Sequence, residues 1–136
     1  STAVYYSEIS SAASPVSFKI GMGSVAWDAS TTSDPTLALF NDFFTSNLTP
    51  KFSNVAVSGI EVSYRDAAGR TWVSHDNSVN AQNASFTGIS QESDETGDYS
   101  KFTCNFNCYV YYQDPGTMLW DSIQIQNAAF KGWFKR

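Results

Sequence analysis

Hydrophobic and polar residues alternate without interruption along residues 101–113, and this is the most regular pattern in the chain. A period of two places successive side chains on opposite faces of a β-strand. One face is apolar and consists of Phe102, Cys104, Phe106, Cys108, Val110 and Tyr112. The other face is polar apart from two large aromatic residues, Tyr109 and Tyr111. A strand of this length predicts a central place in a sheet, because a long exposed edge favours aggregation.

Shorter segments on both sides of this one are also predicted to be strands. They span residues 16–27, 52–65, 70–75, 84–92, 122–126 and 127–134. The turn at residues 66–69 predicts a β-hairpin, because Gly69 can take the left-handed conformation. The turn Asp114-Pro115-Gly116-Thr117 predicts a second hairpin, which joins the long strand to the segment near Trp120.

Residues 34–48 follow a different period. Leu37, Phe40, Phe44 and Leu48 recur at steps of three and four, which is the spacing of one helix face. The preceding Ser33-Asp34-Pro35 is typical of a helix start, with a capping side chain and a proline in the first turn. We expect one short helix here, and an extended crossover with buried phenylalanines is the alternative.

Many short strands joined by polar turns are typical of all-β architectures. The sequence therefore predicts a mainly β protein: an antiparallel β-sandwich of seven to eight strands with one short helix near residues 34–48. At 136 residues the chain is expected to hold a single domain, residues 15–136. Residues 1–14 are weakly patterned and are expected to form an N-terminal arm or linker.

Charged side chains are sparse, and this limits the kinds of partner that we expect. They make up 15 % of the residues, against about 25 % in an average soluble domain. The net charge is −5 and the eight Lys and Arg residues are thinly spread, so nucleic acid is not an expected partner. No apolar run approaches the ~20 residues of a membrane-spanning helix, so no transmembrane segment is expected.

The two cysteines, Cys104 and Cys108, lie four positions apart in the long strand. That spacing is roughly 13 Å along a regular strand, whereas a disulfide needs Cα atoms within about 7 Å. We expect two buried free thiols that act as small hydrophobic residues. A local bulge that lets them pair is the alternative.

Catalytic chemistry has little support in the sequence. His75 is the single histidine, and Asp66, Asp76 and either Ser74 or Ser78 lie near it in the chain. A catalytic triad is a spatial arrangement, however, and neighbours at one strand end do not form one. Nucleophile-elbow, zinc-protease and phosphate-loop motifs do not occur. We therefore expect a protein that is not an enzyme and needs no cofactor.

A metal site has one weak candidate. Glu92, Asp94, Glu95 and Asp98 crowd a single turn, and calcium prefers several oxygen ligands. Their spacing does not match a helix–loop–helix calcium loop, so a solvated acidic turn is the default expectation.

Exposed aromatic side chains are the candidate ligand- or partner-binding residues. We predict Tyr109, Tyr111, Trp120 and Trp133 for this role. Sugars stack on aromatic rings, and Tyr and Trp are also enriched in protein–protein interfaces. Burial of the same residues under a second sheet or the helix is the alternative.

Four stretches of the chain carry a resemblance to a known group of proteins. They are residues 59–72, which include YRDAAGRTW, then SFTGI at 85–89, FTCNFNC at 102–108 and IQNAAFKGWF at 125–134. Together they resemble the small exported lipoproteins of Bacteroidetes bacteria over about residues 55–136. Those proteins end in a T-F-N-C strand followed by I-x-N-G-x-F-x-G-x-F, and Ala128 here replaces the first glycine of that pattern.

The resemblance implies a β-sandwich exported to the outer membrane surface, the periplasm or the extracellular space, with a lipid anchor or peripheral membrane association. It implies no catalytic activity. Our leading hypothesis is a non-catalytic accessory or interaction subunit of a bacterial cell-envelope assembly, with other envelope proteins as partners. The alternative is a carbohydrate-binding module that holds a surface glycan on Tyr109, Tyr111 and a tryptophan.

Overall fold

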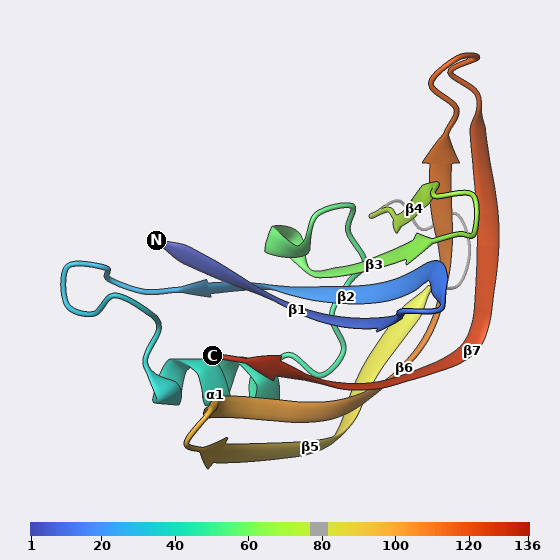
Figure 1. The fold of residues 1–136 in the computed structure, drawn as a ribbon. Coiled ribbons are helices and arrows are strands. Elements are labelled where there is room, and N and C mark those ends of the chain that lie inside the picture. Colours follow the sequence, from blue (N-terminus) through green and yellow to red (C-terminus); the bar gives the residue numbers. More distant parts are fainter. Residues whose placement is uncertain (77–81) are drawn as a thin grey trace.

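The computed structural model describes residues 1–76 and 82–136, and in these residues seven antiparallel strands form one sheet (Figure 1). The strands are β1 (Thr2–Ser11), β2 (Ser14–Ala26), β3 (Ile60–Arg65), β4 (Thr71–Ser74), β5 (Asn83–Asp94), β6 (Gly97–Gln113) and β7 (Trp120–Lys135). One helix, α1 (Leu37–Ser46), and a short 3-10 turn, η1 (Ala56–Ser58), lie between β2 and β3. The prediction of a mainly β protein with one short helix is confirmed.

Strand β6 is the centre of the sheet, as its length and alternation predicted. The strand order is β1-β2-β3-β4-β6-β5, and β7 pairs with β6 as well. Because β7 occupies one edge of β6 along most of its length, β4 and β5 share the other edge. The β4 pairing is short and consists of Val73 opposite Tyr111 and Ser74 opposite Val110.

The β6–β7 hairpin bends sharply partway along its length (Figure 1). The register slips at the bend, where Phe106 pairs with Ala128 but Cys108 pairs with Ile125. This leaves an extra residue in β7, and Asn127 takes a positive φ of 53° there. Such a β-bulge bends the strand that carries it. The expected two-sheet sandwich is not confirmed, because the bent β6 pairs with both β4 and β5 and keeps all strands in one sheet.

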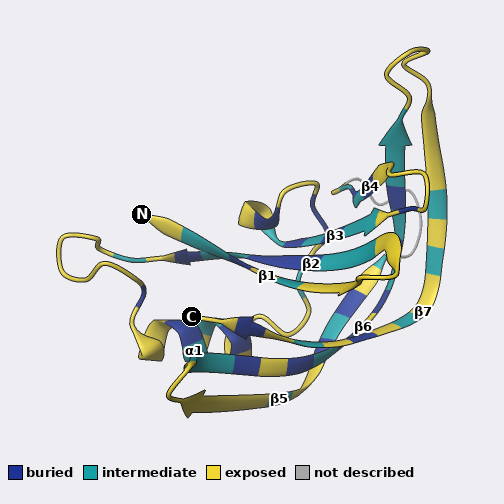
Figure 2. Ribbon diagram, viewed as in Figure 1, coloured by how far each residue is buried: buried dark blue, intermediate teal, exposed yellow. Residues whose placement is uncertain are grey.

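The buried residues lie mostly inside the bend (Figure 2). Many of their side chains are aromatic. Phe102 and Phe134 stack with ring centroids 4.6 Å apart, and Phe44 of α1 stacks on Phe134 at 4.7 Å. Tyr5 of β1 meets the edge of Phe40 of α1 at 5.2 Å. Helix α1 therefore covers the end of the core that the sheet leaves open. Its first turn is capped by Thr36, whose hydroxyl accepts a hydrogen bond from the Leu39 backbone N–H.

The N-terminal residues differ from their prediction. Residues 2–11 are not an arm or linker but the edge strand β1, which pairs with β2 from Thr2 opposite Ala26 to Ser11 opposite Ser14. Tyr5 anchors this strand by burying its ring against α1. The weak pattern of this segment reflects its place at the sheet edge, where most of its side chains remain exposed.

The two cysteines are free and buried, as predicted. Both point into the core from β6, and burial raises the pKa of each thiol to about 12. Thiols with such a pKa are poor nucleophiles and poor metal ligands at neutral pH. Cys104 and Cys108 are therefore packing residues.

Candidate functional site

Three of the four predicted aromatic residues come together on the outer face of the sheet. Tyr109 and Tyr111 point outward from β6 with ring centroids 6.4 Å apart. Trp120 begins β7 opposite Gln113, so it lies on the same outer face. His75 completes the group, because its ring lies 4.6 Å from Tyr111 and 5.3 Å from Trp120.

His75 is the member that sequence reasoning missed as a binding residue. It follows the last residue of β4, and only the pairing of β4 with β6 brings it beside Tyr111. His75 lies two residues after Val73, which pairs with Tyr111, so strand alternation places His75 on the same outer face as Val73. To predict its contact with Tyr111, one must also know that β4 pairs with β6, and the sequence did not show that pairing.

Trp133 lies apart from the other predicted residues. It faces outward from β7 opposite Lys101, near the other end of the hairpin. Its side chain is 57 % exposed and borders a shallow pocket with Glu92 and Tyr99. The four aromatic residues therefore do not form one surface.

The end of the β6–β7 hairpin carries three consecutive exposed apolar side chains. Met118, Leu119 and Trp120 are 60 %, 70 % and 57 % exposed. In Figure 1 this end of the hairpin projects beyond β4, and Figure 2 shows it exposed at the top of the molecule. We call residues 114–120 the hairpin tip.

The hairpin tip is ordered by Asp114. Its Oδ1 accepts hydrogen bonds from the backbone N–H groups of Gly116, at 2.8 Å, and Thr117, at 2.9 Å. These bonds lower the pKa of the Asp114 carboxyl. The Asp114 N–H in turn donates to the Leu119 carbonyl at 2.9 Å. Because the polar groups of the turn satisfy one another, the apolar side chains are left to face solvent.

The β3–β4 hairpin supports the side of the projecting strands. Asp66 accepts hydrogen bonds from Trp72 Nε1 at 3.0 Å and from Arg70 Nε at 2.8 Å. These interactions, led by the bond from Trp72, lower the pKa of Asp66 to about 2. The Trp72 ring packs 5.4 Å from Tyr112 of β6, and the Arg70 guanidinium lies over both rings. Asp66 therefore has a structural role, in contrast to the catalytic one considered from sequence.

Ser74 and His75, two further residues considered for catalysis, both make other contacts. Ser74 is buried, and its hydroxyl donates to the Ser53 carbonyl while it accepts from the Val62 N–H. His75 contacts aromatic rings. Ser78 lies outside the described residues.

The weak calcium candidate was Glu92, Asp94, Glu95 and Asp98 in the acidic turn, and these side chains do not gather in a metal-binding group. Asp94 accepts hydrogen bonds from Thr96, and Asp98 accepts from Ser93 and Arg136. Glu92 pairs with Lys101. Over residues 1–76 and 82–136, no three His, Cys, Asp or Glu side chains gather in a metal-binding group. Three of the four carboxylates, those of Glu92, Asp94 and Asp98, are thus paired with protein donors.

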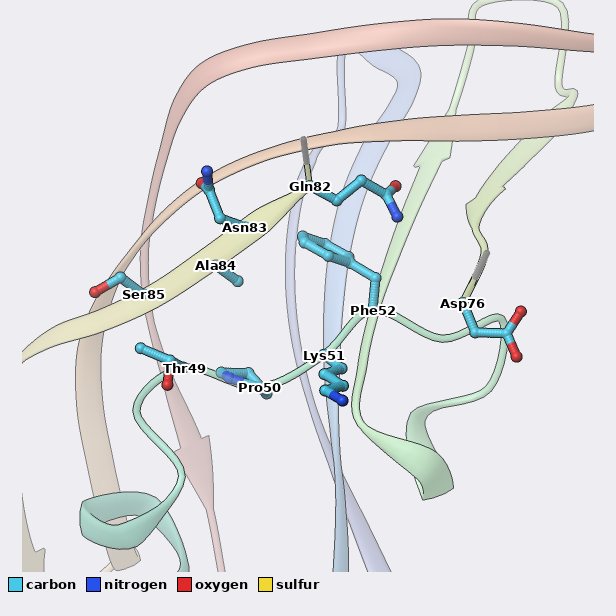
Figure 3. A pocket seen from close by; sticks show the side chains of 9 residues that line it. All are labelled: Thr49, Pro50, Lys51, Phe52, Asp76, Gln82, Asn83, Ala84 and Ser85. Atoms are coloured by element: carbon cyan, nitrogen blue, oxygen red, sulfur yellow. The ribbon is translucent and has the colours of Figure 1, made fainter. Parts of the chain in front are cut away.

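A cavity of about 580 Å³ lies between residues 49–52 and the start of β5 (Figure 3). The polar side chains at the two ends of this cavity do not point toward one another. In Figure 3 the Asp76 carboxylate and the Asn83 amide point to opposite sides, with the Phe52 ring between them. A binding or catalytic pocket usually directs a few polar groups toward one point, so this cavity is a weaker candidate than the aromatic surface.

Comparison with protein families, with curated proteins and with solved structures finds no match for this chain. Among the described residues, no helix has both the length and the apolar character needed to cross a membrane.

Proposed function

We propose that this protein is a non-catalytic interaction module that binds a partner protein through the end of its β6–β7 hairpin. The binding surface consists of His75, Tyr111, Met118, Leu119 and Trp120, and we call it the hairpin surface. The observation that carries the proposal is the exposure of three consecutive apolar side chains, from 57 % to 70 %, at a projecting and well-ordered turn. Exposed apolar groups that gather in this way mark interaction sites.

The composition of the hairpin surface favours a protein partner. Aromatic residues and methionine are enriched in protein–protein interfaces, and Trp and Tyr are frequent among the residues that dominate binding energy. The ring of His75 contacts both Tyr111 and Trp120. These three side chains are thus already ordered, which lowers the entropy cost of binding.

The charges around the hairpin surface favour the same kind of partner. Asp114 and Asp121 flank the tip, and residues 109–126 contain no Lys or Arg. The neighbouring cation is Arg70 of the β3–β4 hairpin, whose charge helps to lower the pKa of Asp114. Anionic membranes attract basic segments, so an acidic hairpin is poorly suited to them. The partner that fits is a protein with an apolar patch and basic residues at its rim.

The setting that we propose is a bacterial cell-envelope assembly, in which this chain is an exported accessory subunit. The resemblance of residues 55–136 to small exported lipoproteins of Bacteroidetes supports that setting. Peripheral or lipid-anchored attachment to the outer membrane belongs to the same proposal.

The test is a pull-down in mild detergent from the organism that encodes the chain, read by mass spectrometry and sizing. Wild type is compared with Leu119→Lys, which removes an apolar contact and places a cation against the expected basic rim. Leu48→Lys is the matched control, because Leu48 is 41 % exposed but lies outside the hairpin surface. We expect a stoichiometric partner with wild type and Leu48→Lys and its loss with Leu119→Lys.

Two results would contradict the proposal. One is a partner retained equally by all three proteins, which would place the interface elsewhere. The other is a protein that remains monomeric with no co-purifying chain. Binding of wild type, but not of Leu119→Lys, to phospholipid vesicles would assign the hairpin tip to a membrane instead.

Carbohydrate binding is the second candidate function. The observation that favours it is the pair of outward tyrosines, Tyr109 and Tyr111, whose ring planes are tilted by 32° to each other on the outer face of β6. Neighbouring aromatic rings of this kind can stack on sugar rings. Loss of retention on an insoluble polysaccharide by Tyr109→Ala and Tyr111→Ala is the expected outcome, and unchanged retention would exclude this platform.

A further inference from the structure

A groove lined by side-chain amides runs across the outer face of the sheet at its bend. It has a volume of about 400 Å³ and is bordered by Asn83 of β5, Asn107 of β6 and Asn127 of β7. Tyr109 and Gln124, which are paired across β6 and β7, line one end. A second hollow of about 300 Å³ shares the three asparagines and extends the groove toward Ser85 and Asn105.

The three asparagines form an ordered row across three strands. Asn107 Nδ2 donates to Asn83 Oδ1 at 2.9 Å, and Asn107 Oδ1 accepts from the Asn127 backbone N–H at 2.8 Å. The bulge in β7 places Asn127 in this position. Asn107 is thereby fixed, and the row forms the floor of the groove.

Several amides around this floor keep their hydrogen-bonding capacity. Within residues 1–76 and 82–136, the side chains of Asn105, Gln124, Gln126 and Asn127 make no hydrogen bond to another protein group. Each amide offers two donor hydrogens and one acceptor oxygen. The groove thus presents closely spaced donors and acceptors to a ligand from solvent.

The lining carries no charge. None of the described residues that border either hollow is Asp, Glu, Lys, Arg or His, although the chain as a whole has a net charge of −5. A phosphorylated or carboxylated ligand would lack a counter-charge here. A purely apolar ligand would leave the amides unpaired, which is costly when they are desolvated.

We propose that this amide groove binds a neutral saccharide. Vicinal hydroxyl groups each donate and accept, so they match an amide that does the same. Tyr109 offers a ring at the end of the groove on which a sugar face can stack. The inference rests on the second proposed function, carbohydrate binding. It adds the class of ligand, a neutral saccharide, and the polar part of the binding site. It does not depend on protein binding by the hairpin surface.

The test is affinity electrophoresis of the full chain in gels that contain one soluble polysaccharide each. The neutral probes are dextran, mannan, galactomannan, xyloglucan and arabinoxylan, and the acidic probe is polygalacturonate. The groove variant is Gln124→Ala with Gln126→Ala, two exposed residues whose loss leaves the asparagine row intact. The control is Asn54→Ala, which removes an exposed amide outside the groove, and thermal melting checks the fold of each variant.

We expect retardation by at least one neutral polysaccharide. The groove variant should bind that polysaccharide about tenfold more weakly, as the loss of one or two ligand hydrogen bonds predicts, and the control should bind like wild type. Retardation by none of the neutral probes, or by polygalacturonate alone, would overturn the proposal.

One further outcome separates the groove from the wider function. If Tyr109→Ala with Tyr111→Ala abolishes retardation but the groove variant does not weaken it, the chain binds carbohydrate and the assignment of the amide groove is wrong.

Discussion

The two ends of the β6–β7 hairpin carry similar apolar side chains and use them differently. At the end near α1, the rings of Phe102 and Phe134 stack in the core and Phe44 of the helix covers them. At the other end, Met118 and Leu119 face solvent at a turn that no other element covers in the described structure. The burial of an apolar residue in this hairpin therefore depends on which elements pack against it. One end contributes stability, and the other leaves exposed the apolar side chains that we propose bind a partner.

The largest effect is expected from truncation in the covered end. Phe134 is fully buried between aromatic rings of β6 and α1, so Phe134→Ala removes a large apolar surface and leaves a cavity. It should lower the free energy of unfolding by about 3–5 kcal/mol. Urea denaturation followed by circular dichroism measures this, and a loss below about 1 kcal/mol would show that the core does not depend on this stack.

An intermediate effect is expected where the β3–β4 hairpin supports the projecting end. The pKa of Asp66 is lowered to about 2 in the folded protein, below its unfolded value of about 4. A lowered pKa contributes stability above pH 4, and this stability is lost as the pH falls toward 2. Wild type should therefore be more stable than Asp66→Asn at pH 5, and the difference should vanish near pH 2.

Unfolding titrations of both proteins between pH 5 and 2 measure that difference. Other carboxyl groups, such as Asp94 and Asp98, also have lowered pKa values, but they are present in both proteins and cancel in the comparison. A difference that stays constant over this pH range would show that the Asp66 charge does not stabilise the fold.

The smallest effect on stability is expected at the hairpin tip. Leu119 is 70 % exposed, so Leu119→Ala should change the free energy of unfolding by no more than about 0.5 kcal/mol. The same urea experiment tests this. A destabilisation as large as that of Phe134→Ala would remove the contrast between the two ends and would show that Leu119 stabilises the fold.

Much of the fold could be predicted because it follows from local periodicity. The alternation in residues 101–113 identified β6, its buried face and the free cysteines, and the steps of three and four identified α1. Two hairpin turns were placed correctly at residues 66–69 and 114–117. The expectation of two sheets failed because a single long strand can bend at a bulge and pair on both sides of it.

The candidate site was predicted only in part, for the same physical reason. Alternation showed that Tyr109 and Tyr111 share the polar face of β6, whereas the position of Trp120 beside them follows from the pairing of β6 with β7 in the structure. Nothing local showed that His75 joins this group, that Trp133 lies apart from it, or that the three asparagines of the amide groove form a row.

The sequence by itself determined which residues form strands and which of their faces is apolar, because the pleat of a strand fixes the direction of each side chain. Only the tertiary structure decided which strands are neighbours, since that choice depends on pairing between residues far apart in the chain. The short pairing of β4 with β6 assembles the hairpin surface, and the bulge at Asn127 shapes the amide groove. Both proposed binding surfaces therefore arise from strand pairing and register.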